Sequence, residues 1–342
     1  KSGAKKIFKT FKRKNIKIYF KKKEFPEIIE LKKIYLSLNS FKPDLIVALG
    51  GGAVLDYGKI ASIIDSHTNI KKIILKNQIP KKKNYTLVAV PTTSGSGAEV
   101  TPNAVMYINK IKYAVDEKKV RPNKYFLIPS LTIPAPKKIK ASSGFDAIAQ
   151  SIESLISVRS TQESLNFAKR SLEYSLKSYV DFVNVPNDRN AERMSIAANL
   201  SGKAIGISKT TAPHAISYPF TAHFGIPHGH AVSLTLDKIL LYNFNYAKYS
   251  RTKFNLIDRY NLIFKLTKTK NILDLFLYIK KLKLMSGLED NFNNLGINIL
   301  REKQKLLSGI NESRLLNNPV NIKVGDIISI ISWVFSHHSL VI

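Results

Sequence analysis

The first half of the chain alternates short apolar runs with stretches whose apolar positions recur every three or four residues. Unbroken or period-two apolar runs indicate strands, whereas a 3.6-residue period indicates helices. The pattern predicts strands over 16–20, 45–49 and 86–90, and helices over 26–38 and 53–64. The run at 45–49 is unbroken, which predicts a buried strand. Because strands that alternate with helices are typical of a parallel sheet covered by helices, we predict an α/β fold for this half.

The pattern changes beyond about residue 140, where helical periods follow one another without strands. Examples are 162–183 and 191–205, and the proline-rich stretch 129–136 lies close to the change. We therefore predict two domains, an α/β domain over residues 1–137 and an all-helical domain over residues 138–342. With 342 residues, 44% of them hydrophobic, the chain is long enough to bury both cores.

The composition indicates a reducing compartment and no membrane span. The chain has no cysteine, which excludes disulfides and a thiolate zinc site. It has no apolar run near the roughly 18–20 residues that a membrane span needs. The longest apolar stretch, 327–335, is broken by serines and predicts a terminal helix or a contact surface. We expect a cytoplasmic protein with no membrane partner.

The formal net charge of +30 is the outlier in the composition. Such a charge would suit a partner such as nucleic acid or an anionic membrane surface. The lysines are, however, spread among many Ile and Asn residues, with short clusters at 21–23 and 81–83 and no RNA-recognition signature. An AT-rich coding sequence explains the same bias. We therefore expect no specific nucleic-acid partner, but a positive field that attracts anionic substrates and a phosphate-bearing cofactor.

Two polar turns follow predicted strands of the α/β half. Gly50-Gly51-Gly52 follows the strand at 45–49 and opens a helix, so bare backbone can approach an anion at the helix N-terminus. The second turn, residues 91–99, offers hydroxyl groups and exposed amides after the strand at 86–90. Either turn alone also suits an ordinary tight turn. Ligands bind in open parallel sheets at the carboxyl ends of the strands, so the two turns together predict a cofactor site.

Four of the seven histidines lie between residues 214 and 230, namely His214, His223, His228 and His230. Neutral imidazole is a favoured ligand of Zn, Fe and Ni, although surface or capping histidines would explain the cluster by itself. A carboxylate, Asp146, favours a metal site; it lies in a segment that predicts the start of a helix, with Gln150 on the same face. One carboxylate, one amide oxygen and two imidazoles can hold a divalent ion with a position open for substrate.

Four stretches of the chain together resemble the iron-containing, or group III, alcohol dehydrogenases. Residues 50–59 resemble the family's GGGS-x-x-D-x-x-K turn, and residues 91–99 resemble its PTT-x-G-x-G-x-E loop. Asp146 matches the family's first metal ligand, and His214 and His228 match its two later histidine ligands. The resemblance covers nearly the whole chain, with the motifs in the family's order.

The resemblance implies the dehydroquinate synthase-like architecture of that family. This is an N-terminal dinucleotide-binding α/β domain and an all-helical C-terminal domain, with metal and nicotinamide in the cleft between them. It implies two cofactors, NAD(P)H and one divalent ion, Fe or Zn, and the ion would polarise the carbonyl oxygen for attack by hydride. The expected metal ligands are Asp146, Gln150, His214 and His228. The expected cofactor contacts are Gly51, Gly52, Ala53 (where the family has serine), Thr92, Thr93, Ser96 and Lys112.

The chain departs from the family pattern at three further places. Gln150 stands where most members have a third histidine; because an amide oxygen is a poorer ligand, we expect a weaker or three-ligand site shifted toward zinc. Tyr218 stands where many members have a non-ligand histidine assigned to proton relay, and an unperturbed phenol does not titrate near neutrality. The chain starts at Lys1 and, by resemblance, after the family's first β-strand, so we expect a shortened N-terminus and an exposed sheet edge.

Two segments of the helical half, 201–230 and 312–319, look like the phosphonoacetaldehyde reductase subgroup of the family. We therefore expect an oxidoreductase that reduces phosphonoacetaldehyde to 2-hydroxyethylphosphonate, with Lys209 and Arg314 as candidates for binding the phosphonate. One alternative is a general group III alcohol dehydrogenase that acts on uncharged small alcohols and aldehydes. Another is a catalytically decayed, basic binding protein. A homo-oligomer is compatible with each of these hypotheses.

Overall fold

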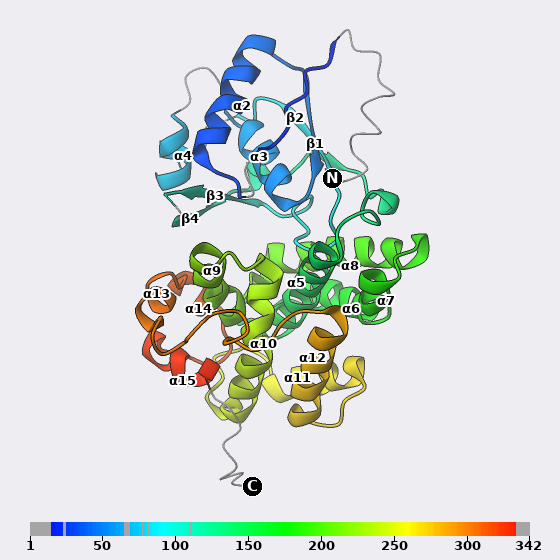
Figure 1. The fold of residues 1–342 in the computed structure, drawn as a ribbon, viewed down its shortest axis with the longest axis vertical. Helices are drawn as coiled ribbons and strands as arrows, with labels where there is room; N and C mark the ends of the chain where they lie inside the picture. Colours follow the sequence, from blue (N-terminus) through cyan, green and yellow to red (C-terminus); the bar gives the residue numbers. More distant parts are fainter. Residues whose placement is uncertain are drawn as a thin grey trace.

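The computed structural model describes residues 15–22, 25–64, 69–76, 78–80, 82–109 and 111–332. An α/β part lies above a helical part in the view of Figure 1. The α/β part contains α2 (Ile28–Phe41), β1 (Leu45–Gly50), α3 (Gly52–Ala61), α4 (Ile70–Lys76), β2 (Thr86–Pro91), β3 (Asn103–Ile108), β4 (Ile111–Asp116), η2 (Lys118–Val120), β5 (Lys124–Tyr125) and η3 (Pro129–Leu131). The strands predicted at 45–49 and 86–90 are thus confirmed as β1 and β2, and the helices predicted at 26–38 and 53–64 as α2 and α3.

The main sheet has the strand order β1-β2-β5, and its strands are parallel. β1 and β2 are paired in register from Leu45 opposite Thr86 to Gly50 opposite Pro91, so their carboxyl ends meet at one edge. The Thr92 N–H donates to the Gly50 carbonyl at 3.0 Å, which ties together the turns that follow the two strands. β3 and β4 form a separate antiparallel hairpin that we did not predict.

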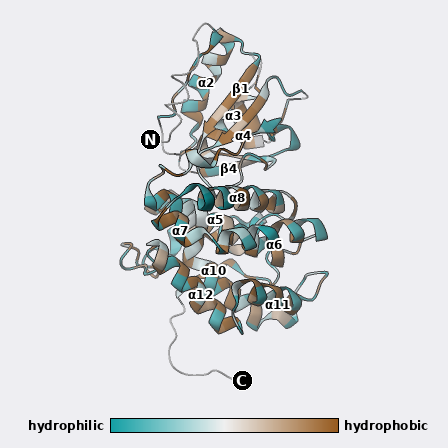
Figure 2. Cartoon of the chain, turned by 90° about the vertical axis from the view of Figure 1, so that its right-hand side faces the viewer, coloured by the Kyte–Doolittle hydropathy of each residue, from teal (hydrophilic) through white to brown (hydrophobic). Residues whose placement is uncertain are grey.

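The helical part consists of α5 (Lys137–Ile156), α6 (Gln162–Leu176), α7 (Tyr179–Asn184), α8 (Asp188–Ser208), α9 (Ala212–Phe224), α10 (His228–Asn245), η4 (Ala247–Tyr249), α11 (Leu256–Thr267), α12 (Ile272–Ser286), α13 (Lys303–Ser308), α14 (Glu312–Leu315), η5 (Val324–Asp326) and α15 (Ile327–Ser332). α5 is the central helix and packs against α6, α8 and α10. β1 is largely brown in Figure 2, whereas α8 and α6 carry much teal, as expected for amphipathic helices. Within the described residues, no helix combines the length and the apolarity that crossing a bilayer requires.

Two predictions about strands are wrong. Residues 16–20 form no strand, and Ile16 and Phe20 are 43% and 55% exposed. An apolar run becomes a strand only where a neighbouring strand accepts its backbone hydrogen bonds, and no described strand pairs with these residues. β1 is only half-buried, because Val47 is 54% exposed while Ala48 is 5% exposed. The reason is that α3 covers the face that carries Ala48, and β2 is the one strand paired with β1 in the described part of the chain.

Three predicted helices have different bounds. The segment 162–183 is two helices, since α6 ends at Leu176 and α7 begins at Tyr179, whose buried hydroxyl donates to the Ala141 carbonyl of α5 at 2.9 Å. The helix that carries Asp146 begins at Lys137 instead of near residue 144. The helix predicted at 191–205 extends over Asp188–Ser208. Of the apolar stretch 327–335, α15 accounts for Ile327–Ser332, and residues 333–335 lie outside the described residues.

The turn that follows β2 joins the α/β part to the helical part. Gly97 has φ +59°, and a Cβ there would lie 2.4 Å from the Cα of Gly202 in α8, so the two backbones touch. The buried Glu99 accepts a hydrogen bond of 2.9 Å from the side chain of Asn199, also in α8. Only glycine fits this approach, because a side chain would clash and the backbone conformation disfavours one. The contact holds the polar turn against α8, which packs on the central helix α5.

Candidate metal centre

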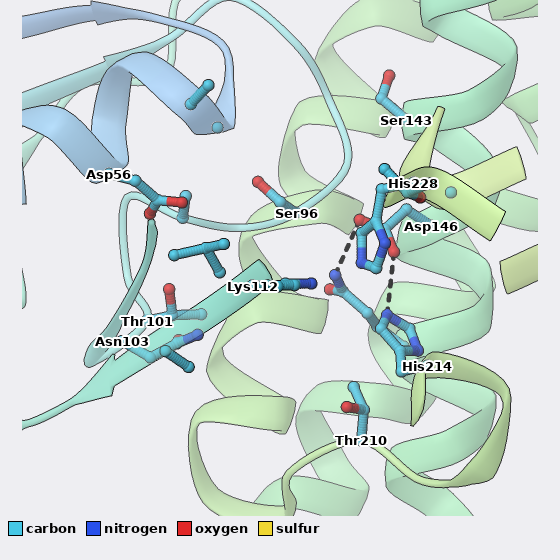
Figure 3. A pocket seen from close by; sticks show the side chains of 18 of the residues that line it. Asp56, Ser96, Thr101, Asn103, Lys112, Ser143, Asp146, Thr210, His214 and His228 are labelled. Carbon is cyan, nitrogen blue, oxygen red and sulfur yellow. Dashed lines mark hydrogen bonds and ion pairs between the residues drawn. The ribbon is translucent and has the colours of Figure 1, made fainter. Parts of the chain in front are cut away.

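Three of the predicted metal ligands converge in the structure. Asp146 lies in the middle of α5, His214 in the first turn of α9, and His228 at the first residue of α10. Their potential ligand atoms all lie within 4.8 Å of one another, and His214 Nε2 is 3.1 Å from Asp146 Oδ1 (Figure 3). Nitrogen and oxygen ligands bind zinc at about 2.0–2.2 Å. The three side chains therefore fit around a single divalent ion.

A close helix crossing brings His228 to Asp146. Gly229 follows His228 at the start of α10, where a Cβ would lie 2.0 Å from the Ser142 carbonyl oxygen and 2.8 Å from Asp146 Cβ. The absence of a side chain lets α10 begin in contact with α5. Pro227 precedes His228 at the helix N-cap, with φ −54°. The sequence Pro-His-Gly thus directs the imidazole toward the carboxylate.

Glu153 is a buried carboxylate that we did not predict, and it bonds to the ring nitrogen of His214 that does not face Asp146. Its Oε2 bonds to His214 Nδ1, and its Oε1 accepts bonds of 2.9 Å from both the N–H and the hydroxyl of Thr211. Since Nδ1 is engaged, Nε2 is the nitrogen left for a metal. Carboxylates commonly orient metal-binding histidines in this way. Glu153 follows Asp146 by two helical turns on the same face of α5, which is the signal that could have revealed it.

The charges around the three side chains favour metal binding. Burial lowers the pKa of His228 to about 3, and the Lys112 charge adds to the effect, so its imidazole is neutral. Burial would raise the pKa of Asp146, but the hydrogen bond from His214 and the nearby histidine charges hold it below the usual value. Burial would likewise lower the pKa of His214, but Glu153 and Asp146 raise it to about 10. A cation bound at His214 Nε2 would take the place of the proton that this nitrogen shares with Asp146.

Gln150 holds Asp146 in position. Its Nε2 donates to Asp146 Oδ2 at 3.1 Å, and its Oε1 accepts from the Ser201 hydroxyl at 2.9 Å. The amide oxygen, the atom that could ligate a metal, is therefore engaged by Ser201, a partner that we did not predict. Among the other clustered histidines, His223 is exposed, and His230 bonds through Nε2 to the Glu289 carbonyl at 2.6 Å. Neither of these two belongs to the group of converging ligands.

A pocket of about 300 Å³ connects this centre to the polar turns of the α/β part. Five of the predicted cofactor contacts line it from that side, namely Gly52, Ala53, Thr93, Ser96 and Lys112. Gly51 caps the N-terminus of α3, and Thr92 is buried behind the lining. Asp146, His214 and His228 line the same pocket from the helical side. The pocket therefore joins a helix N-terminus, which suits an anion, to a group of metal-binding side chains.

Three cationic side chains also line the pocket: Lys112 of β4, Lys209 after α8, and Arg314 of α14. Lys112 Nζ lies 3.5 Å from the centroid of the Tyr218 ring. Burial would raise the pKa of the Tyr218 hydroxyl, but the charges of Lys112 and Arg314 lower it below its ordinary value. The phenol that replaces the family's relay histidine therefore lies in a cationic environment.

Comparison with solved structures identifies the class of fold. Sulfoacetaldehyde reductase from Bifidobacterium kashiwanohense, solved in complex with NAD+, superposes with a TM-score of 0.82 at 26% identity, over 92% of this chain and 82% of that one. An alcohol dehydrogenase from Oenococcus oeni superposes with a TM-score of 0.80 at 24% identity, over 92% of this chain and 83% of that one. The architecture is that of the group III alcohol dehydrogenases, as predicted.

Sequence comparison identifies the family. The profile of the iron-containing alcohol dehydrogenases matches residues 2–130, and that of the C-terminal domain of the Fe-containing alcohol dehydrogenase family matches residues 140–335. The chain belongs to the iron-containing alcohol dehydrogenase family.

Two curated relatives are similar over part of their length. Phosphonoacetaldehyde reductase of Streptomyces viridochromogenes is 32% identical over 217 residues, which are 60% of this chain and 55% of that protein. The bifunctional aldehyde-alcohol dehydrogenase of Escherichia coli (strain K12) is 30% identical over 259 residues, which are 71% of this chain and 29% of that protein. The chain thus spans about half the length of the first relative and less than a third of the second. The predicted likeness to the phosphonoacetaldehyde reductases is confirmed.

Proposed function

We propose that this protein is an NAD(P)H-dependent oxidoreductase that reduces a small aldehyde to an alcohol at a divalent metal ion. The convergence of Asp146, His214 and His228 at one end of a pocket, opposite the glycine turn of α3, carries the proposal. A bound ion would supply Lewis-acid polarisation of the aldehyde oxygen, and the nicotinamide would supply hydride. Family membership and the relatives' names support the same reaction class.

The roles of the lining residues follow from their places in the pocket. Gly51, Gly52 and Ala53 form the N-terminus of α3, where backbone N–H groups and the helix dipole suit a pyrophosphate. Thr93 and Ser96 line the pocket from a hydroxyl-bearing turn that also contains the buried Thr92, and Lys112 lines it from β4. We assign these four residues to the cofactor. NAD(H) has the support of the sulfoacetaldehyde reductase complex. The proposed domains, 1–137 for the nicotinamide cofactor and 138–342 for the metal, meet along this pocket.

The metal ligands keep their geometry through buried partners. Glu153 fixes the tautomer and direction of His214, and Gln150 holds the second oxygen of Asp146. We propose that Gln150 contributes to the metal site weakly or through a water molecule. With the third histidine of most members replaced by an amide, we expect a site that accepts Zn as well as Fe.

The substrate in this proposal is phosphonoacetaldehyde, which is reduced to 2-hydroxyethylphosphonate. The relative from Streptomyces viridochromogenes supports it. The net charge of +30 is compatible with it, because a positive field raises the local concentration of an anionic substrate and speeds its association. We also propose that the protein is cytoplasmic, has no specific nucleic-acid partner and self-associates into a homo-oligomer.

Cofactor titration tests the reaction class. Metal-loaded protein is titrated with NADH and NADPH at moderate salt, and binding is followed by nicotinamide fluorescence. The proposal requires saturable binding that weakens in Gly52→Val, since a Cβ at Gly52 already lies 3.1 Å from Ser96 Oγ. Salt-sensitive DNA binding without a cofactor signal would instead identify a decayed basic binding protein.

Steady-state kinetics tests the substrate. We compare phosphonoacetaldehyde with propanal and lactaldehyde, with the metal and nicotinamide cofactor held constant. A clear preference in kcat/KM for the phosphonate supports the proposal. Equal or higher kcat/KM on the uncharged aldehydes would reject it and leave a general alcohol dehydrogenase.

A further inference from the structure

Two of the three cations of the pocket, Lys209 and Arg314, differ in whether a carboxylate neutralises them. Lys209 Nζ bonds both carboxylate oxygens of Asp116, at 2.9 and 2.8 Å. No carboxylate of the described residues forms a salt bridge with Arg314, whose Nη1 donates a long bond of 3.4 Å to Thr210 Oγ1. An anion bound by Lys209 would compete with Asp116. An anion bound by Arg314 would displace at most a weak hydrogen bond.

The backbone around Arg314 is fixed beside the metal ligands. The side chain of Asn311 caps α14 by accepting the Arg314 N–H at 3.1 Å. The Asn311 N–H in turn donates to the carbonyl of Ala215, the residue after His214, at 3.3 Å. α14 is therefore attached to α9 at the turn that carries a proposed metal ligand. Arg314 lines the same pocket as His214 and His228.

Thr210 is the second fixed group of this site. It is 3% exposed, and its carbonyl accepts a bond of 3.1 Å from the Asn317 side chain. Its neighbour Thr211 bonds to Glu153, the carboxylate that orients His214. The hydroxyl and the guanidinium therefore lie on the same side of the pocket as His214, at a place set by two buried networks. Figure 3 shows Thr210 and His214 on this side.

We propose that Arg314, assisted by the Thr210 hydroxyl, binds the tetrahedral oxyanion head group of the aldehyde, and that Lys209 does not. This inference rests on the proposed function and names the residues that set its charge specificity. A two-carbon aldehyde carries its head group one methylene away from its carbonyl carbon, so the group that binds the head must share the pocket with the metal ligands, as Arg314 does. The planar guanidinium can donate two parallel hydrogen bonds to a phosphonate or a sulfonate.

The kinetic test compares Arg314→Met with Lys209→Met, which remove one pocket cation each. In the wild type, kcat/KM is measured for phosphonoacetaldehyde, sulfoacetaldehyde and propanal, and the ratio of each charged aldehyde to propanal defines the selectivity. We expect Arg314→Met to lower this ratio by about 10- to 100-fold, as for loss of hydrogen bonds to a charged group. Lys209→Met should keep it within about twofold. Equal losses in the two variants, or a loss in Lys209→Met alone, would overturn the assignment.

Binding measurements make the inference testable apart from turnover. Calorimetric titration of the metal-loaded protein with 2-hydroxyethylphosphonate and 2-hydroxyethylsulfonate should show binding that Arg314→Met abolishes and Lys209→Met retains. Arg314→Lys keeps the charge without the planar fork and should bind with intermediate affinity. If no aldehyde is reduced but the anions bind in an Arg314-dependent way, the proposed function fails and the oxyanion site stands. If propanal is reduced and the anions bind equally to all variants, the proposed reduction of aldehydes stands and the oxyanion site at Arg314 is rejected.

Discussion

Replacement of Glu153 by Gln tests most sharply whether Glu153 orients His214 for metal binding. Glu153 is 0% exposed, and its two oxygens divide their bonds between Thr211 and His214. Glutamine can keep an oxygen toward Thr211, but it then presents an NH₂ donor to His214 Nδ1. This favours the tautomer with its proton on Nε2, the nitrogen that must be free to bind metal. The change therefore removes the group that fixes the tautomer and direction of the ring while it preserves the volume of the side chain.

The expected loss of metal affinity follows from the bond between Glu153 and His214, a proposed metal ligand. Loss of such a partner lowers metal affinity by about 10- to 100-fold, or roughly 1.4–2.8 kcal/mol. The dissociation constants for Zn²⁺ and Fe²⁺ are measured by competition with a chelator, and the melting temperature of the metal-free protein is measured in parallel. We expect the affinity to fall in this range.

Glu99→Gln is the matched control for this variant. Glu99 is also buried, at 3% exposed, but its side chain bonds to Asn199 and does not contact the three ligands. We expect Glu99→Gln to keep the metal dissociation constant within about threefold. Wild-type affinity in Glu153→Gln, or equal weakening in the two variants, would refute the role of Glu153.

Three further substitutions test the construction of the centre. His228→Ala should lose bound metal and turnover together, and wild-type metal stoichiometry in this variant would exclude His228 from the site. Gln150→His should tighten Fe²⁺ binding, measured by chelator competition; unchanged affinity would reject the amide as the cause of weak ferrous binding. Gly229→Ala should lower the free energy of unfolding by about 1–3 kcal/mol in urea, because its Cβ would lie 2.0 Å from the Ser142 carbonyl. Its control is Gly206→Ala, where the new Cβ would make only an ordinary contact of 3.6 Å with Pro102 Cδ. This variant should be neutral or stabilising, so equal effects would contradict the close-crossing argument.

The fold could be predicted where the signal was local. The apolar run of β1 and the helical period of α3 identified both elements within a few residues. The segment 16–20 has the same kind of apolar run and forms no strand, because strand formation depends on a partner that the run itself does not specify. The half-exposure of Val47 has the same origin, since burial depends on which elements cover a strand.

The candidate site could be predicted in its residue types but less so in its partners. Asp146, His214 and His228 belong to motifs and were found. Glu153 and Ser201 act through hydrogen bonds between helices that are distant in sequence, so no spacing within one segment indicates them fully. For the same reason, no sequence pattern separates Lys209 from Arg314. The difference arises from Asp116, which ends β4 in the α/β part and reaches Lys209, after α8, only in the folded chain.

Metal reconstitution tests the central claim most directly. The protein is stripped of metal with a chelator and titrated with Zn²⁺ or Fe²⁺, while NAD(P)H oxidation by phosphonoacetaldehyde and metal content are measured on the same samples. We expect no oxidation in the stripped protein and a linear rise with added ion that ends at one ion per chain. In Asp146→Asn, one of the three converging ligands is weakened, and the break at one ion per chain should disappear. Full NAD(P)H oxidation in the stripped protein, or a wild-type titration by Asp146→Asn, would contradict the account.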